Sequence, residues 1–302
     1  MISICIPVRN AGAEFRDHLN RWKEQDCSEE FEIVVLDSGS EDGTVEIAKN
    51  LGARVQTIPP TEFNHELSRN QLAESARGDL LVFTVQDAYP GNENTLAELT
   101  EPLRQEGELA GVTGRQIPRP DADVIARWET EYHGKVFDKG VRKKRMPPSE
   151  EFTRLDFNQQ VEIISFDNVC SAIRRSIWKD FPFSRLDFGE DLDWGFRVMK
   201  AGHAILHNPA AQVHHSHNRS HWIRLKRYFV TRYFLNQLLM RSPEDFLWSE
   251  EETFAAVAEF RLIVENLRKK LRQQSHQVSR LRVSRSLPYL LLRALEKWGP
   301  ES

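Results

Sequence analysis

The residues best suited to chemistry gather in one stretch of the sequence, residues 187–220. It begins with acids and ends with histidines, namely Glu190, Asp191, Asp193, His214, His215 and His217. A carboxylate at the start of a helix is held rigidly and can take a proton from an attacking hydroxyl group. His215 and His217 point to the same side of an extended segment, whereas His214 points away, so this pair can bind one metal ion. A plainer interpretation, helix-capping acids followed by the polar face of a strand, stays open.

Two apolar runs earlier in the chain end in further polar pairs, Asp37-Ser38 and Gln86-Asp87. Asp37 can accept hydrogen bonds from a nucleobase or a ribose, or it can form a turn. Asp87 can bind Mg²⁺ or Mn²⁺, which take carboxylate and phosphate oxygens, or it can be a turn residue. If His215 or His217 lies near Asp87 in space, the side chains form one metal site.

The first 115 residues predict the α/β elements that would hold these groups. Strands are expected at residues 2–7, 31–37, 54–58 and 80–85, and helices at 15–22, 45–51 and 65–76. This alternation is typical of a doubly wound, mostly parallel sheet with helices on both faces. Ligands of such sheets bind at the carboxyl ends of the strands, where Asp37 and Asp87 stand. Arg69, in the third helix, can bind a phosphate there or remain a solvated helix residue.

Missing motifs and the overall charge argue against several protein classes. No GxGxxG follows the first strand and no GxxxxGK[ST] occurs, which disfavours dinucleotide dehydrogenases and P-loop enzymes. The net charge of −4 gives no overall attraction to nucleic acid. The length of 302 residues favours one large domain with an extension.

The C-terminal part differs in character, so we expect a catalytic domain over residues 1–220 and a helical extension over 221–302. From Arg219 onward the chain carries 16 Lys and Arg against 9 Asp and Glu, a net charge of +7, which leaves −11 on residues 1–218. Basic and aromatic residues alternate through 221–241, and further helices are expected near 250–272 and 287–298. The extension can be a helical bundle packed on the domain, a surface that touches the membrane, or both.

Cysteine usage and hydropathy favour a cytoplasmic location, and the basic, aromatic C-terminal part adds peripheral contact at the inner membrane face as one alternative. Cys5, Cys27 and Cys170 form neither a CxxC motif nor a disulfide framework, which fits a reducing compartment. The N-terminus lacks the basic region of a signal peptide. No apolar run approaches the ~20 residues needed to span a bilayer.

Several motifs in order resemble the family 2 glycosyltransferases of the GT-A fold, and most of all the bacterial rhamnosyltransferase-type members. The motifs are IPVRN, VVLDSGSEDGT, FNHELSRN, VFTVQDAYP, NVCSAIRR, GEDLDW and VHHSHN, within about residues 1–220. The resemblance implies an inverting transfer of a sugar from a nucleotide-diphosphate sugar to an acceptor hydroxyl, and a divalent metal, Mg²⁺ or Mn²⁺. Such a displacement needs one base and one cation, and no covalent nucleophile.

The resemblance also assigns a role to individual positions. The nucleotide side comprises Pro7, Arg9, Asp37, Ser38, Arg69 and Gln86, with Arg69 near the diphosphate. The metal side comprises Asp87, as the last acid of the DxD motif, and His215, with His217 as the alternative. Asp191, with Glu190 beside it, matches the catalytic base. Trp194 is expected to line the acceptor side.

The chain departs from the family pattern at two places. Val85 stands where the first acid of DxD is usual, and Glu66-Leu67 replaces a frequent Gly-Gly pair near the donor. The expected partners are the sugar donor and a sugar or lipid-linked sugar acceptor of cell-surface polysaccharide or glycolipid synthesis. Two alternatives are a non-catalytic GT-A module that binds nucleotide sugars and a metal-dependent nucleotidyltransferase or phosphohydrolase.

Overall fold

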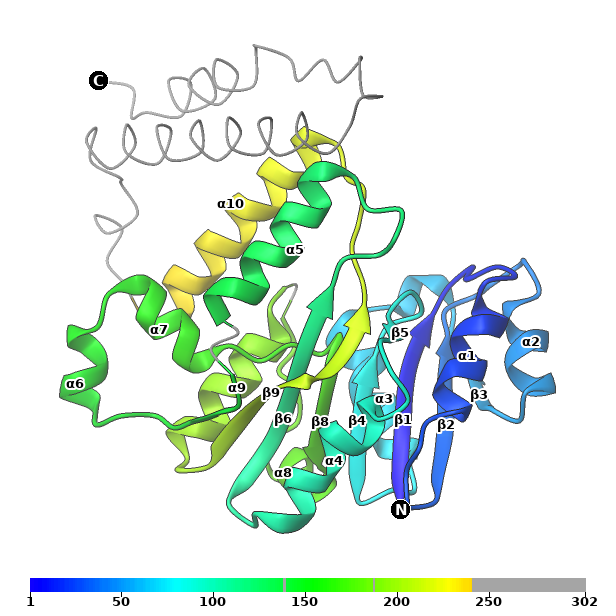
Figure 1. The fold of residues 1–302 in the computed structure, drawn as a ribbon, viewed down its shortest axis with the longest axis horizontal. Helices are drawn as coiled ribbons and strands as arrows, with labels where there is room; N and C mark the ends of the chain where they lie inside the picture. Colours follow the sequence, from blue (N-terminus) through cyan, green and yellow to red (C-terminus); the bar gives the residue numbers. More distant parts are fainter. Residues whose placement is uncertain (138–139, 187, 241–302) are drawn as a thin grey trace. The chain divides into compact units, whose positions relative to one another are not determined.

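The computed structural model describes residues 1–137, 140–186 and 188–240, and the helices predicted near 250–272 and 287–298 lie outside them. Within these residues nine strands form one sheet, in the order β3-β2-β1-β4-β8-β6-β9-β5, with β7 also paired to β9 (Figure 1). The strands are β1 (Ile2–Val8), β2 (Phe31–Asp37), β3 (Arg54–Thr57), β4 (Leu80–Thr84), β5 (Tyr89–Pro90), β6 (Leu109–Ile117), β7 (Arg142–Lys144), β8 (Cys170–Arg174) and β9 (Ala204–His214). The helices are α1 (Phe15–Lys23), α2 (Thr44–Asn50), the 3-10 turn η1 (Pro60–Glu62), α3 (His65–Ser75), α4 (Thr95–Gln105), α5 (Val124–Phe137), α6 (Ser149–Arg154), α7 (Phe157–Ile164), α8 (Arg175–Asp180), α9 (Glu190–Lys200) and α10 (His221–Leu238).

The first half of the sheet is parallel, as the alternation of strands and helices predicts. β3, β2, β1 and β4 pair in parallel, and every residue of β1 and β4 is buried. The second half is mixed: β8 runs antiparallel to β4 and β6, and β5 and β7 run antiparallel to β9. An apolar run marks a buried strand but not its direction or its neighbours, which is why the prediction of a mostly parallel sheet holds only for the first half.

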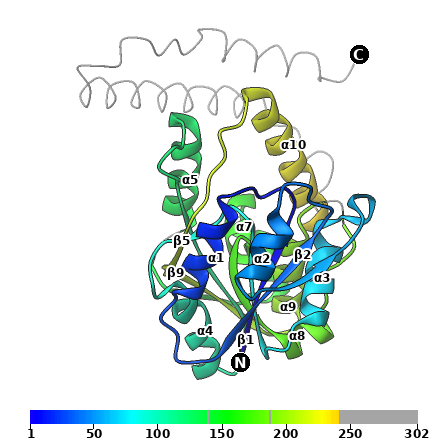
Figure 2. The ribbon, with the colours of Figure 1, turned by 90° about the vertical axis from the view of Figure 1, so that its right-hand side faces the viewer.

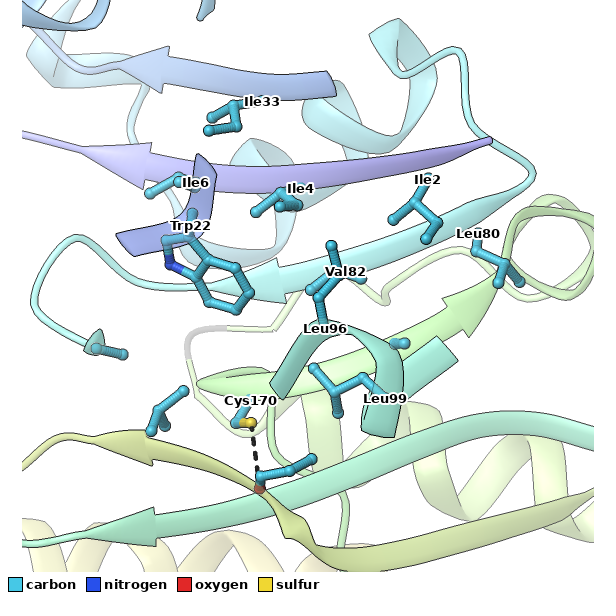
Figure 3. Close-up of a cluster of buried hydrophobic side chains, with 14 of the residues drawn as sticks. Ile2, Ile4, Ile6, Trp22, Ile33, Leu80, Val82, Leu96, Leu99 and Cys170 are labelled. Atoms are coloured by element: carbon cyan, nitrogen blue, oxygen red, sulfur yellow. Dashed lines mark hydrogen bonds between the residues drawn. The ribbon is translucent and has the colours of Figure 1, made fainter. Parts of the chain in front are cut away.

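Two apolar cores cover the two faces of the sheet. Alternate residues of β1 point to opposite faces, so that Ile4 lies in one core and Cys5 in the other. Figure 3 shows the first core, where side chains of β1 and β4 meet those of α1 and α4, among them Ile2, Ile4, Ile6, Trp22, Val82, Leu96 and Leu99. Helices α3, α8 and α9 supply the second core. In Figure 2, α1 and α2 lie in front of the parallel half of the sheet.

Helix α10, which the sequence assigns to the extension, packs against the part of the chain that precedes it. One compact unit spans Met1–Leu239. Arg224 of α10 forms ion pairs with Asp123, at 3.1 Å, and with Glu129 of α5. None of the helices described here is both long and apolar enough to cross a bilayer. All three cysteines are free thiols.

Candidate active site

Asp87, His215 and His217 come together in space, as the sequence predicts. One ligand atom from each lies within 4.8 Å of the others. Nε2 of His215 is 3.6 Å and Nδ1 of His217 is 3.7 Å from the Asp87 carboxylate. The pairing of β5 with β9 causes this meeting, because Tyr89 lies opposite His214 in the ladder. Asp87 precedes Tyr89 by two residues, and the two histidines follow His214 at the same end.

The side chain of His214 points away from this triad, as strand alternation predicts. Its Nδ1 lies 3.5 Å from the carbonyl oxygen of Pro118. It lines a separate hollow together with Tyr89 and Arg119. His214 is therefore a matched control for variants of His215.

Burial favours the neutral form of both histidines of the triad. Burial lowers the pKa of His215, against the opposing effect of the Asp87 charge. Burial, together with neighbouring His215, lowers the pKa of His217 to about 4. Neutral imidazole is the form that binds metals, so one carboxylate and two such rings make a donor set that fits a divalent cation.

The acid pair lies at the start of α9, and its first member is held by a buried ion pair. Glu190 and Arg69 are 7% and 5% exposed, and Nη1 of Arg69 donates to Oε1 of Glu190. Removing one partner of such a pair leaves an uncompensated buried charge, which is strongly destabilising. This ion pair therefore ties α3 to the first turn of α9. The predicted contact of Arg69 with a diphosphate stays a prediction.

Asp191, the predicted base, is half-buried beside the loop that precedes β8. Its Oδ2 accepts a hydrogen bond of 3.4 Å from the backbone N–H of Asn168. Burial and the nearby charges of Glu190 and Asp167 raise the pKa of Asp191 to about 7, against the opposing charge of Arg69. A carboxyl group with a pKa near 7 is suited to general base catalysis at neutral pH.

One loop joins the metal side of the site to the base. Asp167 accepts hydrogen bonds from the side chain of Gln116 and, at 2.9 Å, from the backbone N–H of Val169. Gln116 in turn contacts His215, with 2.7 Å between Oε1 and Nδ1. The charge of Asp167 acts on the pKa of both His215 and Asp191. Asp191 and the triad of Asp87, His215 and His217 therefore belong to one site.

The glycine that precedes α9 is required by the packing of α10. Gly189, the N-cap residue, has a φ of 75°, and a Cβ built there would lie 2.2 Å from the ring of Phe234. Gly43, the N-cap residue of α2, has a φ of 84° and open space around it. We expect Gly43→Ala to cost about 1–2 kcal/mol of stability for the left-handed backbone. Gly189→Ala should cost an additional ~1–3 kcal/mol because of the clash.

Gly189→Ala should also lower turnover, since it shifts the start of the helix that carries Glu190 and Asp191. Thermal unfolding and turnover of both alanine variants measure these effects. Adding Phe234→Ala should restore part of the lost stability to Gly189→Ala. Equal unfolding temperatures of Gly189→Ala and Gly43→Ala would contradict this account.

The residues predicted on the nucleotide side, apart from Arg69 of α3, lie at the carboxyl ends of β1, β2 and β4. The carboxylate of Asp37 accepts hydrogen bonds from the backbone N–H groups of Gly39 and Ser40, so it shapes the turn after β2. The hydroxyl of Ser38 donates to the carbonyl of Val8 at 3.1 Å. Both Asp37 and Ser38 are 1% exposed. The turn reading of Asp37 is thus seen in the structure, and a contact with a nucleoside stays a prediction.

Gln86 joins the loop after β4 to the loop after β1. Its Oε1 accepts from the backbone N–H of Arg9 at 2.7 Å, and its Nε2 donates to the carbonyl of Arg9 at 3.2 Å. Pro7 is buried in β1, and the side chain of Arg9 is exposed. Gln86 thereby fixes the loop next to Asp87.

The prediction that Trp194 lines the acceptor side is wrong. Its side chain is fully buried in the second core, packs against Phe166 and Phe183, and donates from Nε1 to the carbonyl of Phe181 at 2.9 Å. Its position four residues after Glu190 puts it on the inner face of α9. The closeness of Trp194 to the acid pair in sequence does not indicate which face of the helix it occupies.

Three further residues of the site were missed or left without a role by the sequence analysis. Gln116 stands in a segment with no recognisable motif, and Asp167 directly precedes the NVCSAIRR motif, but only the strand pairing reveals that both lie beside His215. Glu66, in the first turn of α3, is fully buried, and neither carboxylate oxygen has a hydrogen-bond partner within the described residues. Burial and nearby Glu190 raise the pKa of Glu66.

Comparison with known proteins identifies the family. Residues 3–181 match the family described as glycosyl transferase family 2. The chain belongs to this family. It is 30% identical over 237 residues to the O-antigen chain rhamnosyltransferase WbaN of Salmonella anatum, an alignment that covers 77% of this chain and 71% of the relative. It is 28% identical over 242 residues to the O-antigen chain rhamnosyltransferase RfbN of Salmonella typhimurium, with 77% and 72% covered.

Solved structures share the fold of this glycosyltransferase at low sequence identity. The mannosyltransferase PcManGT of Pyrobaculum calidifontis, in complex with GDP-Man and Mn²⁺, gives a TM-score of 0.54 at 19% identity, covering 75% of this chain and 60% of that one. Staphylococcus aureus TarS 1-349, in complex with UDP-GlcNAc, gives a TM-score of 0.55 at 17% identity, covering 83% and 69%. These likenesses confirm the predicted GT-A fold.

Proposed function

We propose that this family 2 glycosyltransferase moves rhamnose from dTDP-rhamnose to a hydroxyl group of a growing cell-surface glycan, with inversion at the anomeric carbon. The observation that carries the proposal is the single site in which the triad of Asp87, His215 and His217 is linked to Asp191. The named activity of the two Salmonella relatives supports rhamnose as the sugar.

The chain supplies the proton acceptor for this transfer. Asp191 takes the proton of the acceptor hydroxyl as its oxygen forms a bond to the anomeric carbon and the bond from that carbon to the diphosphate breaks. One base on the acceptor side and a single displacement give inversion. Glu190 keeps Asp191 in place through its ion pair with Arg69, and it also helps to raise the pKa of Asp191.

The triad would hold a divalent cation, which supplies positive charge for the leaving diphosphate. Two of the three protein ligands are imidazole nitrogens, whereas Mg²⁺ prefers an all-oxygen octahedral shell. We therefore expect Mn²⁺ to bind this chain more tightly than Mg²⁺. With Val85 in place of the first acid, Asp87 is the carboxylate ligand.

The acceptor in this proposal is carried on a lipid at the cytoplasmic face of the inner membrane. Near the start of α10, Trp222 and Ile223 are 68% and 48% exposed, and Lys226 and Arg227 are exposed in the next turn. Aromatic and basic side chains together favour the headgroup region of an anionic membrane. Sedimentation with anionic vesicles tests this contact, and failure to sediment with them would remove it from the proposal.

A panel of nucleotides tests the proposed donor. Thermal unfolding of the purified chain is followed with dTDP-, UDP- and GDP-sugars, each with and without Mn²⁺, because a ligand that binds only the folded chain raises the unfolding temperature. We expect the largest rise with dTDP-rhamnose and Mn²⁺ together. A larger rise with a UDP- or GDP-sugar would replace the proposed donor. No rise with any of them would favour a module that has lost the activity.

A further inference from the structure

The side-chain amide of Gln116 lies between the metal triad and Asp167. Gln116 is half-buried near the end of β6, opposite Val213 of β9 in the parallel ladder. Its Oε1 lies 2.7 Å from Nδ1 of His215. On its other side, Nε2 donates to Oδ2 of Asp167. Asp167 is anchored in turn by the backbone N–H of Val169, which donates to Oδ1 at 2.9 Å.

This chain of hydrogen bonds determines which nitrogen of His215 carries the proton. A carboxylate only accepts hydrogen bonds, so the NH₂ group of Gln116 must face Asp167. The amide oxygen then faces His215, and Nδ1 of that ring must be the donor. In the neutral ring the other nitrogen, Nε2, therefore has a free lone pair, and it lies 3.6 Å from the Asp87 carboxylate. Two acceptors that face each other across this distance fit a cation between them.

We propose that Gln116, held by Asp167, is a positioning residue that fixes the tautomer and the ring orientation of His215 for a divalent cation. Hydrogen bonds to the second nitrogen of a ligating histidine commonly have this effect. The same loop reaches the base, because the backbone N–H of Asn168 donates to Asp191 at 3.4 Å. Gln116 and Asp167 thus connect the metal ligand to the loop that contacts the base.

The inference rests on the proposed function only for the presence of a cation, and binding of Mn²⁺ alone tests it without any sugar donor. Free Mn²⁺ is measured by electron paramagnetic resonance during titration of the full chain. We expect Gln116→Leu to weaken Mn²⁺ binding about 10–100-fold, the usual cost of losing such a supporting bond. Gln212→Leu is the matched control, since Gln212 is half-buried on neighbouring β9 and its amide donates to the carbonyl of Pro209. It should bind Mn²⁺ as the unaltered chain does.

The tautomer itself gives a second measurement, which needs no variant to fold. Nitrogen-15 NMR of the metal-free, unaltered chain should show His215 protonated at Nδ1. Gln116→Leu, if folded, should show a mixture of both tautomers. A proton on Nε2 in the unaltered chain would overturn the proposal. Mn²⁺ affinity that is equal in folded Gln116→Leu and in Gln212→Leu would overturn it as well. Failure of the unaltered chain to bind any Mn²⁺ would instead contradict the proposed metal site.

Discussion

Asp191→Asn is expected to reduce turnover by about 10²–10⁴-fold, the usual contribution of a general base, while the nucleotide-sugar donor still binds. Asparagine keeps the shape of the side chain and cannot accept the proton of the acceptor hydroxyl. Turnover of the unaltered chain should rise with pH through about 7, because burial and the charges of Glu190 and Asp167 raise the pKa of Asp191 to that value. In the variant this rise should disappear.

The same substitution should stabilise the fold at high pH. Asp191 has a higher pKa in the folded chain than in the unfolded one, so its ionisation favours unfolding. Below a pH of about 4 the carboxyl group is protonated in both the folded and the unfolded chain, and it costs the fold nothing. As the pH rises to about 7 the group ionises first in the unfolded chain, which lowers the free energy of unfolding. The asparagine side chain cannot ionise, and because a shift of about three pKa units corresponds to about 4 kcal/mol, we expect Asp191→Asn to gain up to about 4 kcal/mol at pH 8 and almost nothing at pH 4. Denaturant unfolding at the two pH values measures the difference.

Asp193→Asn serves as the matched control in the same helical turn. Asp193 accepts hydrogen bonds from Ser184 at 2.6 Å and from Arg197 at 2.7 Å, so its carboxylate serves the helix and not the reaction. This variant should lose some stability and keep most of its turnover. If Asp191→Asn retained turnover, or if it lost donor binding together with turnover, Asp191 would not be the base.

His215→Ala is expected to have the second largest effect, on the binding of Mn²⁺. The residue is 8% exposed, and its Nε2 faces Asp87. Loss of a ligand should weaken metal binding by more than the roughly 10–100-fold that loss of a supporting hydrogen bond costs. Turnover should fall with it, since the leaving diphosphate loses its counter-charge. Titration of Mn²⁺ by electron paramagnetic resonance and calorimetry gives both the affinity and the number of ions.

His214→Ala removes the same ring from the preceding residue and should leave Mn²⁺ affinity unchanged. His214 lies on the opposite side of the segment, near the carbonyl of Pro118. Equal losses of Mn²⁺ affinity in His214→Ala and His215→Ala would show that the conformation of the strand end, and not the ring of His215, determines metal binding. Unchanged affinity in both variants would remove His215 from the metal site.

Much of the site could be predicted because it lies at places that the sequence marks. The strands β1, β2 and β4 are continuous apolar runs, and their carboxyl ends carry Asp37 and Asp87. Strand alternation correctly paired His215 with His217 and set His214 apart. The acid pair was recognisable because two carboxylates begin an amphipathic helix.

The remainder depends on pairings between distant segments, which periodicity does not encode. The contact between Gln116 and His215 follows from the parallel pairing of β6 with β9. Trp194 was misplaced because proximity to Asp191 in sequence does not decide which face of α9 it occupies. The buried ion pair between Arg69 and Glu190 joins two helices that no local pattern connects. The mixed half of the sheet was missed for the same reason.

The central claim is a metal-dependent single displacement at a sugar carbon, and the most direct test is the product formed from the donor. The chain is incubated with Mn²⁺ and the nucleotide sugar that binds best, with water as the acceptor, and early products are followed by proton NMR. We predict free sugar whose first-formed anomer is opposite to that of the donor, together with intact nucleoside diphosphate. Release of sugar phosphate and nucleoside monophosphate would contradict the account, because the bond broken would lie within the diphosphate. Retention of the anomeric configuration would also contradict it.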